Sequence, residues 1–168
     1  MLSIFDVTNW AAQTDYNLYD IYRYNGFYYY AIKKHNSGIA FNANYSDGTI
    51  TYSGKTKPYF FWKCSYNLES PIKPTVKISQ FGDGYRQITP DGINNTLLTF
   101  NLTFDKRTDA ETRAILHFLY NRKGSESFVY FPPFPYNTNK LFKCEQYTHT
   151  TVFSNNHTIT CVLNESPL

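Results

Sequence analysis

The chain has 168 residues and a formal net charge of +3 at pH 7, and charged residues make up only 17% of it. Aromatic residues reach 19%, with 16 Tyr and 14 Phe, a composition that excludes intrinsic disorder, collagen and coiled coil. The length suits one compact domain or two small ones, and the scattered Lys and Arg residues form no basic patch for nucleic acid. The sequence contains no run that is apolar and long enough for a membrane span, and its start lacks signal-peptide features, so we expect a cytoplasmic product.

Residues 1–66 show almost no helical periodicity and predict a small all-β module. Short aromatic segments there are separated by Asn-Gly, Ser-Gly and Asp-Gly turns. Aromatic packing has to stabilise so small a unit, because the cysteines of the chain are too widely spaced for a disulfide framework. We interpret Cys64, Cys144 and Cys161 as buried thiols.

A linker is predicted at residues 67–73, where Pro71 and the following Pro74 interrupt regular structure. Beyond it the sequence pattern changes from aromatic clusters to alternating apolar positions. Residues 74–168 are therefore expected to form a second unit.

In this second unit, Val76 and Ile78 alternate with polar residues, and residues 98–104 do so strictly enough to predict a half-buried strand. A helix is predicted at about 108–123, with a capping box at its start and Gly124 after its end. Further strands are expected at 127–131, 140–147 and 157–164. The fold class is mainly β: a β-sandwich or partial barrel carrying one α-helix, preceded by the small all-β module.

The sequence contains no catalytic or nucleotide-binding motif, and its carboxylates fall mostly at turns or at the start of the helix. One metal hypothesis arises because a turn near Asn155 would place His149, His157 and Cys161 on the same face. A core position for Cys161 and strand-end positions for the histidines explain the pattern better. We therefore predict no enzyme, no cofactor and no metal site.

Four aromatic residues of the first module are candidates for contact with a sugar or a partner: Trp10, Tyr24, Tyr30 and Trp62. Exposed aromatic rings stack on the apolar faces of sugars. The alternative is that these rings fill the core of the module, and the sequence leaves both uses open.

From Pro74 onward, several signatures follow one another in order. They comprise the turn Phe81, Gly82, Asp83, Gly84 and Tyr85 within 76–87, the turn at 90–94, Gly124 to Phe128, Phe131-Pro132-Pro133, and Leu141 to Cys144. In this order and spacing they resemble the phage minor tail protein family. The resemblance implies a tail-tube or distal-tail type of β-domain with a structural role at the tip of a long, non-contractile tail.

The resemblance also implies partners. Members of the class form a ring, here of six or three copies, that extends the tail tube between its last ring and the baseplate hub. The expected partners are further copies of the chain, the tail tube protein, the distal tail protein and the baseplate hub protein. Genome DNA would pass through the lumen without specific binding, no membrane partner is expected, and assembly would take place in the host cytoplasm.

Residues on the predicted strands and beside the prolines are candidates for contact between subunits. They are Phe100, Leu102, Phe104, Ser127, Phe128, Phe131, Pro132, Pro133 and Phe142. Strand edges can pair with neighbouring copies, and aromatic residues anchor interfaces. The alternative is that these residues belong to the interior of the monomer and to an ordinary helix end.

Residues 1–66 resemble the small chitin-binding type of carbohydrate-binding module. The residues that carry this resemblance are Trp10, Tyr16, Asp20, Ile21, Tyr24 to Gly26, Tyr29 to Ala31, His35 to Gly38 and Trp62. This chain has Tyr19 where that family usually has Gly before the Asp. The resemblance implies a host-surface glycan reader carried on a structural tail domain as an alternative function; a hydrolase of cell-wall sugars would need a carboxylate pair that the sequence does not show.

Overall fold

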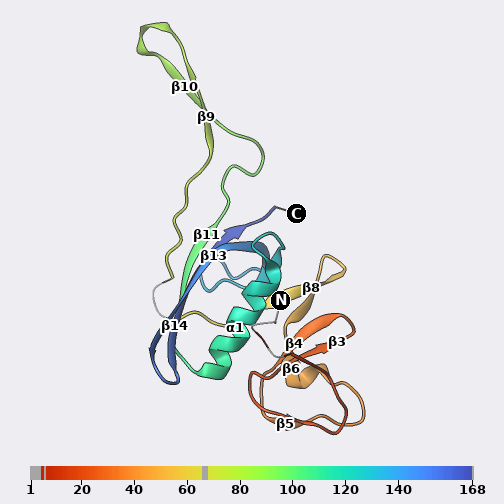
Figure 1. Ribbon diagram of the computed structural model, residues 1–168. Helices are drawn as coiled ribbons and strands as arrows, with labels where there is room; N and C mark the ends of the chain where they lie inside the picture. Colours follow the sequence, from red (N-terminus) through yellow and green to blue (C-terminus); the bar gives the residue numbers. More distant parts are fainter. Residues whose placement is uncertain (1–4, 6, 66–67, 168) are drawn as a thin grey trace.

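A computed structural model describes residue 5 and residues 7–65 and 68–167, and over this part the protein is mainly β with a single α-helix (Figure 1). The strands form one six-stranded, one four-stranded and two two-stranded sheets. Within the described residues, all of these sheets are open rather than closed into a barrel. The predicted mainly β class with one helix is confirmed.

The first part of the chain builds two small sheets. The four-stranded sheet has the order β1 (Thr8–Asn9), β3 (Ile21–Tyr24), β4 (Phe27–Ala31), β6 (Ser46–Asp47), and β2 (Asp15–Tyr16) pairs with β5 (His35–Asn36). A short 3₁₀ turn, η1 (Ala43–Tyr45), precedes β6. Tyr16, Tyr22 and Ala31 form a small core that Trp10 and Phe41 flank. Aromatic packing therefore stabilises this region, as the sequence predicts.

The six-stranded sheet joins both parts of the chain. Its order is β11 (Thr99–Arg107), β14 (Asn156–Glu165), β13 (Lys140–Phe153), β12 (Phe128–Tyr130), β8 (Lys55–Phe60), β7 (Thr49–Tyr52). β8 runs parallel to β12, with Tyr59 opposite Val129, whereas the other pairs are antiparallel. Gly48 leads from β6 into β7 at φ +134°, where a Cβ atom would lie 2.8 Å from the carbonyl oxygen of Tyr28. Any larger residue at Gly48 would therefore collide with the backbone of β4 and would be strained at this positive φ.

Helix α1 (Asp109–Arg122) lies across one face of this sheet and begins and ends where the sequence predicts (Figure 1). The Thr108 side chain accepts a hydrogen bond from the backbone N–H of Glu111, which satisfies one of the free donors of the first turn. Lys123 adopts the left-handed conformation at the C-cap. The buried side of the helix presents Ala114, Ile115, Phe118 and Leu119 to the sheet.

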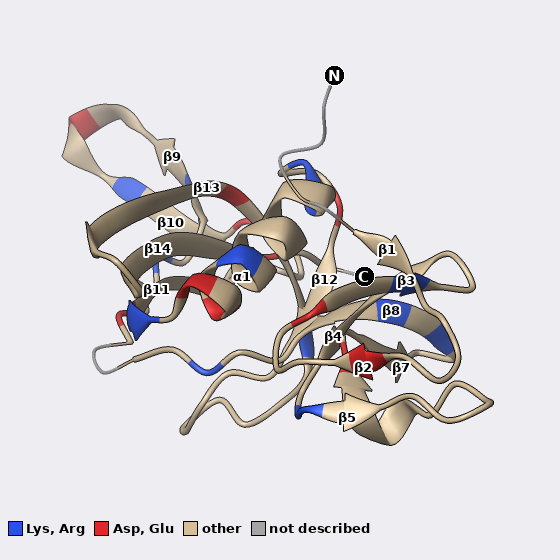
Figure 2. Ribbon diagram, turned by 60° about the horizontal axis from the view of Figure 1, so that its bottom comes forward, with Lys and Arg blue, Asp and Glu red and all other residues tan. Residues whose placement is uncertain are grey.

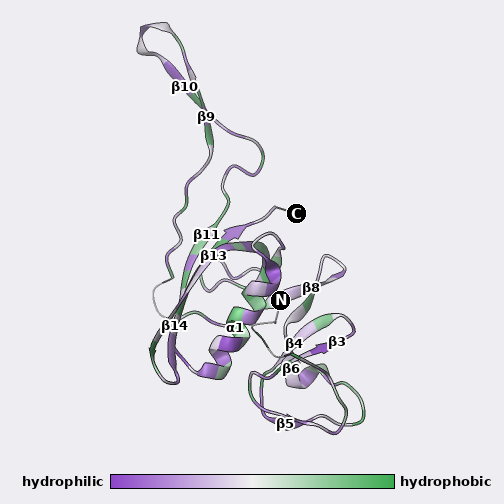
Figure 3. Cartoon of the chain, in the orientation of Figure 1, coloured by the Kyte–Doolittle hydropathy of each residue, from purple (hydrophilic) through white to green (hydrophobic). Residues whose placement is uncertain are grey.

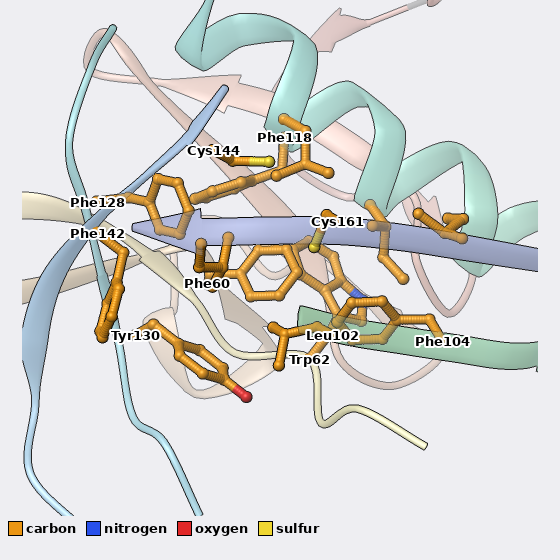
Figure 4. Close-up of a cluster of buried hydrophobic side chains, with 14 of the residues drawn as sticks. Phe60, Trp62, Leu102, Phe104, Phe118, Phe128, Tyr130, Phe142, Cys144 and Cys161 are labelled. Carbon is orange, nitrogen blue, oxygen red and sulfur yellow. The ribbon is translucent and has the colours of Figure 1, made fainter. Parts of the chain in front are cut away.

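The main core contains aromatic side chains from both parts of the chain (Figure 4). Phe60 is fully buried, and its ring lies 5.6 Å from that of Phe104 and 5.3 Å from that of Phe118, measured between centroids. Trp62 packs against Phe60 at 5.2 Å. The division into units 1–66 and 74–168 stays a prediction about folding units, but strands from both sides of it share one sheet and one core.

A buried histidine connects the helix to the first part of the chain. The Tyr30 hydroxyl lies 3.0 Å from Nδ1 of His117, and Nδ2 of Asn121 lies 2.9 Å from its Nε2. Burial, reinforced by the positive charges of Arg122 and Arg113, lowers the pKa of His117 to about 4. The imidazole is therefore neutral at physiological pH.

Candidate assembly site on a projecting hairpin

A hairpin formed by β9 (Val76–Gln80) and β10 (Arg86–Pro90) projects far from the rest of the molecule (Figure 1). We call residues 71–94 the arm and the remainder of the protein the body. Every residue of the arm is exposed. The arm contains the signature turn.

The two faces of the arm differ in chemistry. The antiparallel register places Ile78 opposite Ile88 and Val76 opposite Pro90, so these four side chains share one face. The other face carries the polar residues Lys77, Ser79, Gln87 and Thr89. Ile78 is 57% exposed and Ile88 is 52% exposed, although both would normally be buried. The arm is thus an amphipathic ribbon with an exposed apolar face. Figure 3 marks hydrophobic residues along its two strands in green.

The tip of the arm is the turn predicted as a family signature. The backbone N–H of Phe81 donates to the carbonyl of Tyr85 at 2.9 Å and closes the end of the hairpin around a short 3₁₀ turn, η2 (Gly82–Gly84). Asp83 and Gly84 both adopt positive φ, at 64° and 79°, which a bulky or branched residue would resist. The rings of Phe81 and Tyr85 lie 6.0 Å apart and are both more than half exposed. The turn therefore presents two aromatic side chains at the farthest point of the arm.

The arm joins the body through two extended segments. The backbone N–H of Thr75 donates to the carbonyl oxygen of Asn95 at 2.6 Å. Within the arm, the N–H of Asp91 donates to the carbonyl oxygen of Thr75 at 3.0 Å. Lower down, the N–H of Asn101 donates to the carbonyl of Glu69 at 2.9 Å, which fastens the incoming segment to the edge of β11. These bonds position the base of the arm and leave its apolar face uncovered.

An isolated two-stranded hairpin is only marginally stable in water, and an exposed apolar patch on a soluble protein usually marks an interaction site. Both conditions apply to the arm. The arm is therefore a candidate site of contact with another molecule, with Ile78 and Ile88 as its exposed apolar side chains.

The residues predicted to contact other subunits fall into a buried group and a group that is partly at the surface. Five of them are fully or almost fully buried within the core: Phe100, Leu102, Phe104, Phe128 and Phe142. Their side chains are unavailable to a neighbouring subunit, because they alternate toward the helix and not away from it. β13 pairs with β12 along 140–142 and with β14 from Phe142 onward, so Phe142 itself is paired on both sides.

The loop after β12 keeps some predicted contact residues at the surface. Phe131 is 46% exposed and Pro133 is exposed, while Ser127 is half-buried and Pro132 is buried. Phe131 and Pro133 border an apolar hollow of about 330 Å³ that Phe61 and Trp62 also line. This hollow is a second apolar feature of the surface.

The four predicted sugar-contact residues also differ in exposure: two are buried and two are half-buried. Tyr30 is 1% exposed and Trp62 is 3% exposed, so both belong to the core and cannot touch a sugar. Trp10 and Tyr24 are only half-buried and lie 5.5 Å apart, and the Tyr24 ring stacks on Phe41 at 4.1 Å. The structure therefore brings together two of the four and adds Phe41, which the sequence analysis missed.

The histidines considered for metal binding do lie on one face. Nε2 of His149 is 3.0 Å from Nδ1 of His157, and Nε2 of His157 is 2.5 Å from a carboxylate oxygen of Asp109. Cys161, however, is buried beside Cys144, and the part of the chain that is described contains no group of side chains suited to a metal ion. The histidine contact instead fastens the β13–β14 turn to the start of the helix, where Asn155 and Asp109 exchange two further hydrogen bonds.

A family model for phage minor tail proteins matches residues 58–166, which is more than half of the chain. Tail tip protein M of Escherichia phage lambda is 32% identical over 82 residues, covering 49% of this chain and 74% of that protein. Tail tip protein M of Escherichia phage N15 is 34% identical over 103 residues, covering 60% of this chain and 86% of that protein. Within the described residues, the single α-helix is too short and too polar to cross a membrane.

Proposed function

Because the chain belongs to the phage minor tail protein family, we propose that it is a structural protein of the phage tail tip that assembles through its arm. In this proposal, six or three copies form a ring that extends the tail tube between its last ring and the baseplate hub. The neighbours are further copies, the tail tube protein, the distal tail protein and the hub protein. The ring surrounds the path of the DNA, is built in the host cytoplasm, and has no enzymatic role.

The observation that carries this proposal is the uncovered apolar face of the arm. A protein that worked as a free monomer would gain nothing from exposing Ile78 and Ile88, and would risk aggregation through them. An assembly protein uses such a face, because the same side chains become buried when a neighbour docks. The names of the two relatives, both tail tip proteins, support the same conclusion.

The arm also supplies a matched test. In a phage whose own copy is deleted, the double variant Ile78→Thr with Ile88→Thr removes apolar surface from one face. The control variant Ser79→Thr with Gln87→Thr alters the cross-strand pair on the opposite face. We expect the first variant to fold but to be missing from purified particles, and the control to restore infectivity.

Normal incorporation of the Ile78 and Ile88 double variant would contradict the proposed role of the arm. Absence of the wild-type protein from purified tails, judged by mass spectrometry, would contradict the tail-tip function as a whole.

A second candidate function is that of a host-surface glycan reader, as the resemblance of residues 1–66 implies. The half-exposed group of Trp10, Tyr24 and Phe41 supports it, because stacked, partly exposed rings can receive the apolar face of a sugar. We expect binding on a glycan array that Trp10→Ala abolishes and that the exposed-loop control Phe134→Ala retains. Absence of binding to every sugar on the array would remove this candidate for those sugars.

A further inference from the structure

A hollow of about 280 Å³ lies where the first part of the chain meets the end of the helix. Strand β4 supplies Tyr28 and Tyr30 to its wall, β8 supplies Lys57, and the helix supplies Arg122. We call it the junction hollow. Its volume is near the lower end of the range for small-molecule sites, about 300–1,000 Å³, so it suits one small ligand or one unit of a longer chain.

Positive charge predominates in the junction hollow. Its charged lining residues are Lys57, Arg122 and Glu126, which leaves one positive charge in excess. Blue segments on β8 in Figure 2 mark the Lys residues of that strand. Among the described residues, Lys57 forms no ion pair. The hollow therefore offers a cation that no carboxylate of the described chain neutralises.

Arg122 is the more deeply placed of the two cations. Its side chain is only 11% exposed, and its Nε is buried without a hydrogen-bond partner. Nη1 lies 2.9 Å from a carboxylate oxygen of Glu126, whose own side chain is 55% exposed. Burial raises the pKa of Tyr30, and the charge of Arg122 opposes this rise, so the field of the guanidinium reaches the wall of the hollow. A largely buried cation thus depends on a counter-charge that is free to turn into water.

The rest of the wall combines aromatic rings with hydroxyl groups. Tyr28 is half-buried and Phe27 is 37% exposed, so both rings are partly open to a ligand. Thr49, Thr56 and Ser127 also line the hollow and carry hydroxyls. Aromatic rings receive the apolar face of a sugar, and hydroxyl groups can exchange hydrogen bonds with its edge.

The ion pair of Arg122 with Glu126 is by itself an ordinary feature of a helix end. Residues four apart on a helix are neighbours, and a cation suits the C-terminal turn. This explanation does not extend to Lys57, which comes from β8 in the other part of the chain. The hollow brings this unpaired cation together with Arg122 and with two partly open aromatic rings.

We infer that the junction hollow binds a sugar that carries a carboxylate group, as uronic acids do. The carboxylate lies between Arg122 and Lys57 and replaces Glu126 as the partner of the guanidinium, because an anion held by two cations makes strong, charge-assisted hydrogen bonds. The sugar ring lies against the aromatic wall. An acidic side chain of a protein has the same charge but lacks the apolar face that would cover this wall.

This site is separate from the aromatic group of Trp10, Tyr24 and Phe41. The Tyr28 ring lies 4.8 Å from that of His117, so it faces the helix. The Tyr24 ring stacks on Phe41 at 4.1 Å and belongs to the other face of the small sheet. The inference therefore goes beyond the tail-tip function and requires neither the arm nor Trp10.

The test titrates the whole protein with D-glucuronic acid and, in parallel, with D-glucose, which has the same ring without the carboxylate. Backbone amide signals are followed by NMR. With the acid, we expect saturable shifts confined to β4, β8 and the end of the helix. The affinity for glucose should be at least about tenfold weaker, because the charge-assisted bonds are lost. Added salt should weaken binding of the acid alone.

Two substitutions move the affinity in opposite directions. Lys57→Gln should weaken binding of the acid roughly tenfold, whereas the control Lys55→Gln, at an exposed position on the same strand outside the hollow, should bind like wild type. Glu126→Gln should tighten binding several-fold, because it removes the carboxylate that competes for Arg122.

Absence of shifts with the acid, or equal shifts with both sugars, would overturn the inference. Unchanged affinity in both Lys57→Gln and Glu126→Gln would do the same. Loss of binding in a folded Trp10→Ala variant would place the sugar at the other aromatic group instead. Incorporation of Lys57→Gln into phage tails is measured separately and should be normal, so failure of this inference leaves the tail-tip function intact.

Discussion

The body and the arm use the same kinds of residue in opposite ways. In the body, Leu102 and Phe104 alternate with polar neighbours and are buried. In the arm, Ile78 and Ile88 occupy the same alternating pattern and remain more than half exposed. An alternating pattern therefore shows that one face of a strand is meant to be covered, but it does not show whether the cover comes from the same chain.

This difference between the body and the arm predicts that substitutions in the two regions have different effects. Changes in the body should alter the free energy of unfolding, and changes in the arm should alter incorporation into the tail. Four measurements on the isolated protein test this separation, taken from the largest expected effect to the smallest.

Phe60→Ala should lower the free energy of unfolding by about 3–5 kcal/mol, because it empties a fully buried aromatic site. Phe60 contacts Trp62 from its own part of the chain and Phe118 from the helix, so the loss should affect the whole body in a single denaturation transition. Phe134→Ala, at a position 82% exposed, is the control. Two separate transitions, with only one of them shifted, would contradict the shared core.

Acidification should destabilise the body through His117. Its pKa is about 4 in the folded protein against about 6.5 in an unfolded chain, so the unfolded state takes up a proton first. The stabilisation is complete above pH 6.5 and is lost as the pH falls toward 4, by up to about 3 kcal/mol. The difference in unfolding free energy between wild type and His117→Asn, measured from pH 7 to pH 4, should narrow by this amount. A constant difference would contradict a neutral, buried imidazole.

Thr108→Ala should cost about 1 kcal/mol, because the first turn of the helix loses its side-chain cap. Thr108→Ser keeps the hydroxyl and should retain most of the wild-type stability. Thermal denaturation of the three proteins distinguishes the loss of the cap from a general effect of substitution, since the latter would lower both variants equally.

In the arm, Ile78→Thr with Ile88→Thr should change the free energy of unfolding by less than about 0.5 kcal/mol, because these side chains are not buried by the chain itself. Amide hydrogens of β9 and β10 should exchange far faster than those of β13 and β14. A large loss of stability, or strong protection of the arm, would show that the arm packs on its own body.

Local signals in the sequence located much of the fold. Thr108 and Gly124 flank the helix, which runs from Asp109 to Arg122, and all but the first residue of the alternating stretch 98–104 lies in β11. These features depend on neighbouring residues, so the sequence contains the information directly. The parallel pairing of Tyr59 with Val129 could not be predicted in this way, because it joins residues that are far apart in the chain.

The candidate site was only partly predictable, for the same reason. The sequence predicts a turn at Gly82, Asp83 and Gly84, and the structure has a short 3₁₀ turn there, at the tip of the arm. The exposure of Ile78 could not be inferred. A strand has the same alternating sequence pattern whether its apolar face packs against its own chain or against a neighbouring molecule. The burial of Trp62 and Phe142 could not be predicted from the sequence either, because aromatic residues occur both in cores and at interfaces.

The reach of the arm also has a kinetic consequence. The hairpin projects beyond the body (Figure 1), so in the assembly proposed here a subunit that approaches from that side would meet it first. Two specific protein surfaces usually associate at about 10⁵–10⁷ M⁻¹s⁻¹, since both must be oriented correctly at the moment of encounter. A ribbon held by the few hydrogen bonds at Thr75 and Asn95 relaxes that requirement, because it can engage before the bodies are aligned. In the assembly proposed here, the arm governs how quickly a subunit is captured, separately from how firmly it is held afterwards.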